Sequence, residues 1–95
     1  MAIIITYDVP TKHVEVKKAL FALGYIETLN HSDASKTNGI IYFPNTTVLH
    51  KTKTAGQAIT DLQTITKQLS IELERCIATQ WGPDWSAVWG KPFGQ

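Results

Sequence analysis

The segment AIIITYDVP, residues 2–10, decides how this chain folds. Most of its first residues are β-branched or aromatic, which favours a strand buried within a sheet, and Pro10 has no N–H with which to continue a ladder. We therefore expect a central strand over residues 2–8. Asp8 would lie at the carboxyl end of that strand, directly before the next element.

The apolar residues take up a helical period after Thr11, whose side chain can cap a helix. Gly24 ends this predicted helix, and its lysines lie off the apolar stripe. The stripe consists of Val16, Ala19, Leu20 and Leu23.

Two short strands are predicted next, over residues 25–29 and 40–43. A polar run over residues 31–38 separates them and has the composition of a long hairpin loop. Pro44 breaks the second of these strands, and we expect residues 45–53 to form a loop.

A second helix is expected after Thr54, a favourable capping residue. Its apolar stripe consists of Ala58, Leu62, Ile65 and Leu69. Alternation with period two follows Ser70 and predicts a last strand that leads to Trp81.

This order of elements predicts an α/β sandwich of the ferredoxin-like type, strand-helix-strand-strand-helix-strand. We expect a four-stranded antiparallel sheet with both helices on one face. Ninety-five residues support one core, so residues 1–81 are taken as one domain. Residues 82–95 would form a tail that packs on the domain or on a dimer partner. The aromatic residues of that tail are Trp85, Trp89 and Phe93.

The face of the sheet without helices needs a cover, and a homodimer packed face to face is the simplest one. By strand alternation we expect Ile4, Thr6, Cys76 and Ala78 on this face. Cys76 is the single cysteine and has no metal-ligand spacing around it, so a packed thiol is the favoured interpretation.

Composition narrows the choice of partners. Lysine and arginine outnumber the acidic residues by nine to eight, which is not the basic footprint of a strong duplex binder. RNA or DNA is thus permitted as a partner but not indicated. The apolar run at residues 2–5 is too short to span a membrane and is not a secretory signal, so we expect no membrane association and a cytoplasmic location.

A candidate site lies where the first and third predicted strands end. We expect these strands to run side by side in the same direction, which would bring Tyr7 and Asp8 to the substrate-binding candidates Asn45, Thr46 and Thr47. One carboxylate next to a helix start can help to hold Mg²⁺ with waters and substrate phosphates. The simpler alternatives are a capping aspartate and an ordinary turn.

Two histidines, His13 and His50, flank the same predicted end. A neutral imidazole there could act as a general base or contact a phosphate. The alternative is a solvated ring, since no third residue at a recognisable spacing would orient either histidine.

Residues 3–10 and the helix that ends Leu23-Gly24-Tyr25 resemble the start of the small CRISPR-adaptation nuclease subunit and of the related VapD toxins. The resemblance covers about the first quarter of the chain and the order of its elements. It implies a ferredoxin-like homodimer, and it implies a metal-dependent nuclease in which Asp8 is the catalytic metal ligand, with Mg²⁺ or Mn²⁺ as the cofactor.

Three functional hypotheses follow. The first is a homodimeric nucleic-acid-associated protein that acts as a metal-dependent endonuclease on RNA or DNA. The second is a non-catalytic protein-interaction or regulatory module that uses the open sheet face and the Trp-rich tail. The third is a small-ligand sensor at the corner formed by Asp8 and Asn45.

Overall fold

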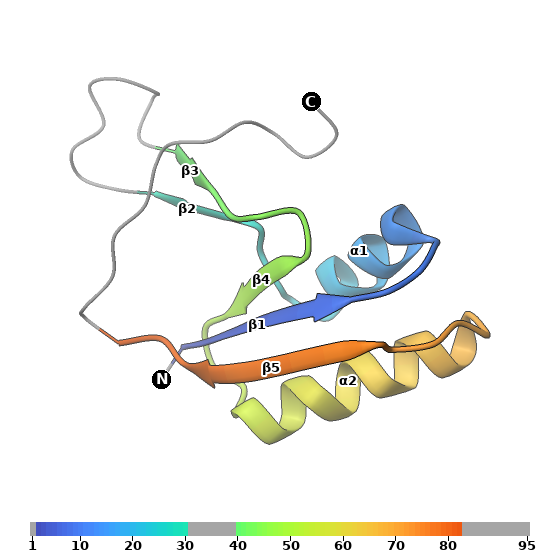
Figure 1. Ribbon diagram of the computed structural model, residues 1–95. Coiled ribbons are helices and arrows are strands. Elements are labelled where there is room, and N and C mark those ends of the chain that lie inside the picture. The colour runs from blue at the N-terminus through green and yellow to red at the C-terminus, as the bar shows by residue number, and fades with distance from the viewer. Residues whose placement is uncertain (1, 31–39, 83–95) are drawn as a thin grey trace.

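The computed structural model describes residues 2–30 and 40–82 and holds five strands and two helices in them (Figure 1). Most of the predicted tail lies outside the described residues. The elements in chain order are β1 (Ile3–Asp8), α1 (His13–Ala22), β2 (Thr28–Asn30), β3 (Ile40–Tyr42), β4 (Thr47–His50), α2 (Ala55–Gln68) and β5 (Arg75–Gln80).

The main sheet has three strands in the order β4-β1-β5, and both neighbours of β1 run antiparallel to it. A separate ribbon is formed by β2 and β3. The backbones of Ile26 and Leu49 exchange two hydrogen bonds of 2.8 and 2.9 Å, which join the segment before β2 to the outer edge of β4. The fold is thus a mixed α/β globule with a three-stranded main sheet in place of the expected four-stranded one.

Pro44 explains this difference. It cannot donate a ladder hydrogen bond, and its carbonyl accepts one of 2.9 Å from the N–H of Thr47, which closes a turn. The turn separates β3, which lies on the expected third strand, from β4, which lies within the expected loop. The prediction of a loop over residues 45–53 was therefore wrong at residues 47–50.

The expected parallel pairing of the first and third strands was also wrong. β3, on the predicted third strand, pairs with β2, and β4 lies beside β1 instead. Thr6 lies opposite Thr47 and Ile3 opposite His50, so β4 runs antiparallel to β1. The parallel arrangement would need the whole third strand to follow a crossover connection, whereas the chain enters β4 from a tight turn.

The core lies between the helices and one face of the main sheet (Figure 1). Ile3, Ile5 and Tyr7 of β1 point into it, and α1 and α2 cover it from the same side. Cys76 and Ala78 lie opposite Tyr7 and Ile5 and pack on this core, which corrects their predicted place on the open face. Cys76 is half-buried, and burial raises the pKa of its thiol.

Only part of the open face is exposed. At its β4 end Thr47 and Leu49 are buried, whereas Thr6 on β1 and Ile77 and Thr79 on β5 are exposed. The uncovered surface therefore lies toward β5.

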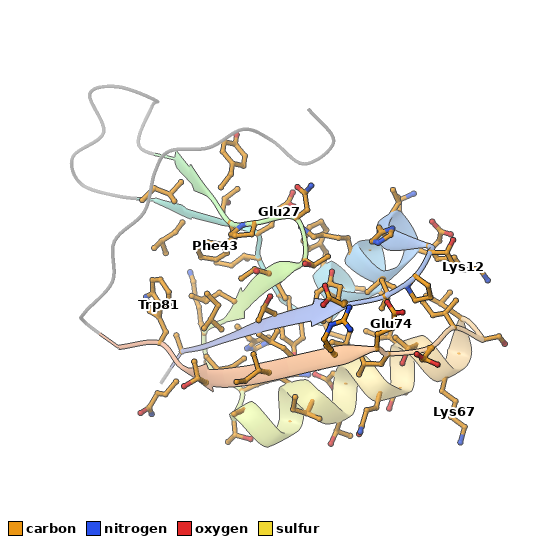
Figure 2. The ribbon with its side chains drawn as sticks, in the orientation of Figure 1. Lys12, Glu27, Phe43, Lys67, Glu74 and Trp81 are labelled. Carbon is orange, nitrogen blue, oxygen red and sulfur yellow. The ribbon has the colours of Figure 1, made fainter. Side chains whose placement is uncertain are left out.

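The two helices begin in different ways. Thr54 caps α2 as predicted, in a capping box with Gln57. The helix α1 begins after Lys12, not Thr11, and Lys12 has the left-handed angles φ 58° and ψ 36°. Its Nζ donates a 2.9 Å hydrogen bond to the carbonyl of Leu69, which ties the start of α1 to the end of α2 (Figure 2).

The predicted stripe of α1 is confirmed at Val16 and Leu20, which are buried, and at Ala19, which packs against the core. Leu23 departs from it and is 42% exposed, because it lies in the C-cap position, whereas Lys17 is buried. Lys17 was expected off the stripe, but its Nζ forms a 2.7 Å ion pair with Glu27 that compensates its burial. The prediction of Gly24 as the helix end is confirmed: its φ is 93°, and an added Cβ would lie 3.1 Å from Nε2 of His50.

We expect Leu20→Ala to lower the free energy of unfolding by about 2–5 kcal/mol, because it opens a cavity at a fully buried position. Leu23→Ala makes the same chemical change at an exposed position and should change the free energy by only about 0.5 kcal/mol. Urea denaturation followed by circular dichroism measures both. Equal effects of the two substitutions would contradict the different burial of Leu20 and Leu23.

Candidate functional site

Asp8 ends β1 and lies directly opposite Arg75, the first residue of β5. The guanidinium Nε donates a 2.7 Å hydrogen bond to Oδ2 of Asp8, and this bond raises the pKa of Arg75. The side chains are 49% and 74% exposed, so solvent screens the pair. The carboxylate that the sequence singled out thus has a cationic neighbour on the adjacent strand.

The end of β1 does meet the turn that precedes β4. The N–H of Tyr7 donates a 3.0 Å hydrogen bond to the carbonyl of Thr46, and the Thr47 hydroxyl donates one of 3.1 Å to the Thr6 hydroxyl. Antiparallel pairing therefore brings these segments together, and not the parallel pairing expected. Asn45 is exposed in the turn, and Thr47 is buried.

The side chains of Tyr7 and Asp8 point to opposite faces of the sheet, as successive side chains of a strand do. The Tyr7 ring is buried among the core residues, and burial together with the nearby charge of Glu27 raises the pKa of Tyr7 to about 12. Thr6 and Asp8 lie on the open face instead. A shallow depression of about 160 Å³ adjoins this end of the sheet. It is lined by Thr6, Tyr7, Asp8, Arg75, Cys76 and Ile77.

The two histidines are not brought together at this end. His13 is exposed at the first position of α1. His50 lies opposite Ile3 at the far end of β1, roughly 17 Å along the strand from Asp8. Its separation from Asp8 follows from the antiparallel direction of β4, and the expectation that both histidines flank one end was wrong for His50.

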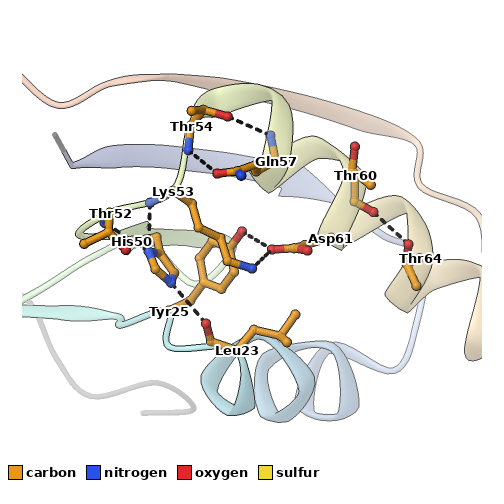
Figure 3. A network of polar contacts seen from close by, with 10 residues as sticks. All are labelled: Leu23, Tyr25, His50, Thr52, Lys53, Thr54, Gln57, Thr60, Asp61 and Thr64. Atoms are coloured by element: carbon orange, nitrogen blue, oxygen red, sulfur yellow. Dashed lines mark hydrogen bonds and ion pairs between the residues drawn. The ribbon is translucent and has the colours of Figure 1, made fainter.

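Both ring nitrogens of His50 are used by the backbone (Figure 3). Nδ1 accepts hydrogen bonds of 3.2 Å from the N–H groups of Thr52 and Lys53, which assigns the proton to Nε2. Nε2 then donates to the carbonyl of Leu23 at 3.1 Å. The ring also stands edge-on to Tyr25, with centroids 4.9 Å apart. This imidazole is a structural tie, and neither nitrogen is available as a general base.

A second polar cluster, not anticipated from the sequence, lies beside His50 (Figure 3). The Tyr25 hydroxyl donates a 2.8 Å hydrogen bond to Oδ2 of Asp61, and Lys53 forms an ion pair with the same oxygen. The Lys53 ammonium also lies 5.5 Å from the centre of the Tyr25 ring. We call Tyr25, His50, Lys53 and Asp61 the Tyr25 cluster. It ties the loop between β4 and α2 to the end of α1.

Electrostatics within the Tyr25 cluster follow from its contacts. Burial and the hydrogen bond to Asp61 raise the pKa of Tyr25. Burial opposes ionisation of Asp61, but the hydrogen bonds from Lys53 and Tyr25 and the charge of Lys53 prevail and lower the pKa of Asp61. The cluster borders a surface hollow of about 560 Å³. It is lined by Lys53, Thr54, Gly56, Gln57, Thr60 and Asp61.

Neither place assembles a metal centre by itself. Among the described residues, no group of three or more His, Cys, Asp and Glu side chains is arranged to hold a metal ion. In that same part of the chain no helix is long and apolar enough to cross a membrane.

Comparisons with known proteins add no relative. No protein-family model matches the chain, and searches of curated proteins and of solved structures also find no match. The resemblance drawn from residues 3–10 and the first helix therefore stays a prediction.

Asp61→Asn tests the Tyr25 cluster, since the amide can still accept from Tyr25 but carries no charge for Lys53. We expect the variant to lose about 1 kcal/mol of unfolding free energy at pH 7. A carboxyl whose pKa is lower in the folded state stabilises the fold above its unfolded pKa of about 3.9, and this stabilisation disappears as the pH falls through the folded value. The difference between wild type and variant should therefore be constant above about pH 5 and vanish toward pH 2.

Urea denaturation at a series of pH values measures this difference. Glu72→Gln is the matched control, because Glu72 is exposed in the connection between α2 and β5. A difference that persists unchanged at the acidic end would contradict the role of the Asp61 charge.

Proposed function

We propose that the chain is a homodimeric, non-catalytic interaction module whose contact surface lies on the β5 side of the main sheet. The observation that carries the proposal is Ile77, whose side chain is 66% exposed in the middle of β5. A branched apolar side chain in that position is suited to burial against a partner.

The state of the candidate catalytic groups supports a non-catalytic module. Asp8 is paired with Arg75, His50 has both ring nitrogens bonded to the backbone, and His13 lies on α1. No nucleophile and base are brought together among the described candidates, as the common mechanisms of covalent catalysis require.

A second copy of the chain is the partner that the charges favour. Asp8 and Arg75 place one negative and one positive group side by side on the exposed part of the sheet. A patch with one charge of each sign is compatible with a copy of itself across a two-fold axis, because it does not repel that copy as a patch of one sign would. A polyanion would favour a patch of one sign, and the net charge of the chain is only +1.

We also propose the ferredoxin-like arrangement for this fold. The backbone bridge between Ile26 and Leu49 continues the strand order as β5-β1-β4 and then the segment that leads into β2. This order, with both helices on one face, is that of the split β-α-β sandwich. A cytoplasmic location belongs to the same proposal.

Sedimentation equilibrium of the full chain over a range of concentrations tests the homodimer. Ile77→Lys should weaken the association at least about tenfold, because it removes one buried apolar side chain per copy and sets two cations near the axis. Val14→Lys is the control, since Val14 is half exposed on α1, away from β5. A protein that is monomeric at all concentrations, or equal effects of both substitutions, would overturn the proposal.

A metal-dependent nuclease is the second candidate, and the exposed carboxylate of Asp8 favours it. A screened ion pair at the surface is weak, so a divalent cation and its waters can replace the guanidinium of Arg75. One carboxylate per chain suffices if substrate phosphates complete the coordination. RNA or DNA would be the substrate.

Incubation of RNA and DNA oligonucleotides with the protein and Mg²⁺ or Mn²⁺ decides between the two candidates. The nuclease requires cleavage that Asp8→Ala abolishes and that Glu74→Gln, a neighbouring exposed acid, retains. The interaction module predicts no cleavage by any of the three proteins at equal concentration, with all three folded as judged by circular dichroism.

A further inference from the structure

We infer that two copies join through the outer edges of their β5 strands, antiparallel and around a two-fold axis at Ile77, to form one continuous sheet. This inference rests on the proposed homodimer and names the contact that makes it. It differs from the face-to-face packing expected from the sequence.

The two edges of the main sheet differ within the described part of the chain. The outer edge of β4 is occupied by the bridge to Ile26. β5 is the other outer strand of the sheet (Figure 1), and it keeps an uninterrupted register with β1 over its whole length. An edge strand without a bulge offers a regular row of backbone donors and acceptors to another strand.

The backbone alternation identifies the groups on that edge. The N–H of Trp81 donates a 2.8 Å hydrogen bond to the carbonyl of Ala2, so the odd-numbered residues of β5 bond to β1. The backbone N–H and C=O of Cys76 and Ala78 consequently point outward. An antiparallel copy centred on Ile77 would set Cys76 opposite Ala78 of the partner subunit, and the reverse, which gives four backbone hydrogen bonds.

The side chains of β5 fit the same register. After Arg75, its first residue, β5 contains no charged residue and no proline, which are two usual devices that protect an edge strand. Ile77 is the most exposed of the large apolar side chains in the described residues. Its two copies would lie side by side at the axis and cover each other. Arg75 would lie opposite Thr79 of the partner subunit, whereas a parallel pair in register would set arginine against arginine.

Both helices would lie on one face of the joined sheet. α2 packs on the core side of the main sheet and contacts β5 and β1, so a two-fold axis at Ile77 would set the two copies of α2 antiparallel on that face. Among the exposed residues of α2 the only charged one is Lys67, near its carboxyl end, and antiparallel helices hold two such lysines far apart. The remaining exposed residues are Gly56, Gln57, Thr60, Gln63, Thr64 and Gln68.

Disulfide trapping tests the register on the full chain, in a Cys76→Ser background that leaves one engineered thiol. Ile77→Cys places two thiols across a non-hydrogen-bonded pair, where the Cα atoms are about 4.5 Å apart, within the range of a disulfide. Thr79→Cys is the matched control on the same face of the same strand, because its two copies would be roughly 13 Å apart. We expect covalent dimers from Ile77→Cys at least tenfold faster than from Thr79→Cys under mild oxidation.

Hydrogen exchange provides a second measurement that needs no substitution. Edge pairing should slow amide exchange at Cys76 and Ala78 as the protein concentration rises, while packing of the open faces would leave these outward amides exposed. A dimer in sedimentation without this protection, or with equal trapping of the two variants, overturns the edge contact but keeps the homodimer. A monomer at every concentration overturns both.

Discussion

The structure depends on the pairing of β1 along both of its edges. Its backbone bonds alternate between β4 and β5, as the hydrogen bonds from Tyr7 to Thr46 and from Trp81 to Ala2 show. Its side chains alternate in the other direction, so Ile3, Ile5 and Tyr7 build the core while Thr6 and Asp8 reach the open face. One strand thereby fixes the register of the sheet, the face that the helices cover and the position of the exposed carboxylate.

Several lysine side chains hold segments of the fold together. Lys12 holds the end of α2, Lys17 is buried against Glu27, and Lys53 is held by Asp61, the last pair shown in Figure 3. Each of them connects its own segment to a different element or loop of the fold. Part of the positive charge in the composition is therefore paired within the fold. A count of lysines overstates the cationic surface of a small domain.

Local patterns predicted what local physics controls. The strand that ends at Asp8 and the capping of α2 by Thr54 both depend on adjacent residues, and the structure confirms them. The strand β4 was missed because Pro44 indicates the end of a strand as well as it indicates a turn between two strands. The cluster of Tyr25 with Asp61 joins residues 36 positions apart, and no spacing in the sequence encodes such a contact. The sequence marks His50 as a candidate base, but only the fold shows that backbone groups form hydrogen bonds with both of its ring nitrogens.

The bridge between Ile26 and Leu49 limits where another copy of the chain can pair with the main sheet. A strand array with two free edges can add molecules without end, which is the geometry of a fibril. Here the outer edge of β4 is already paired at Leu49 from within the chain, so in the proposed dimer the second copy adds at the outer edge of β5. Because a two-fold contact uses the same edge of both copies, this pairing gives an assembly of two and does not repeat along a fibril.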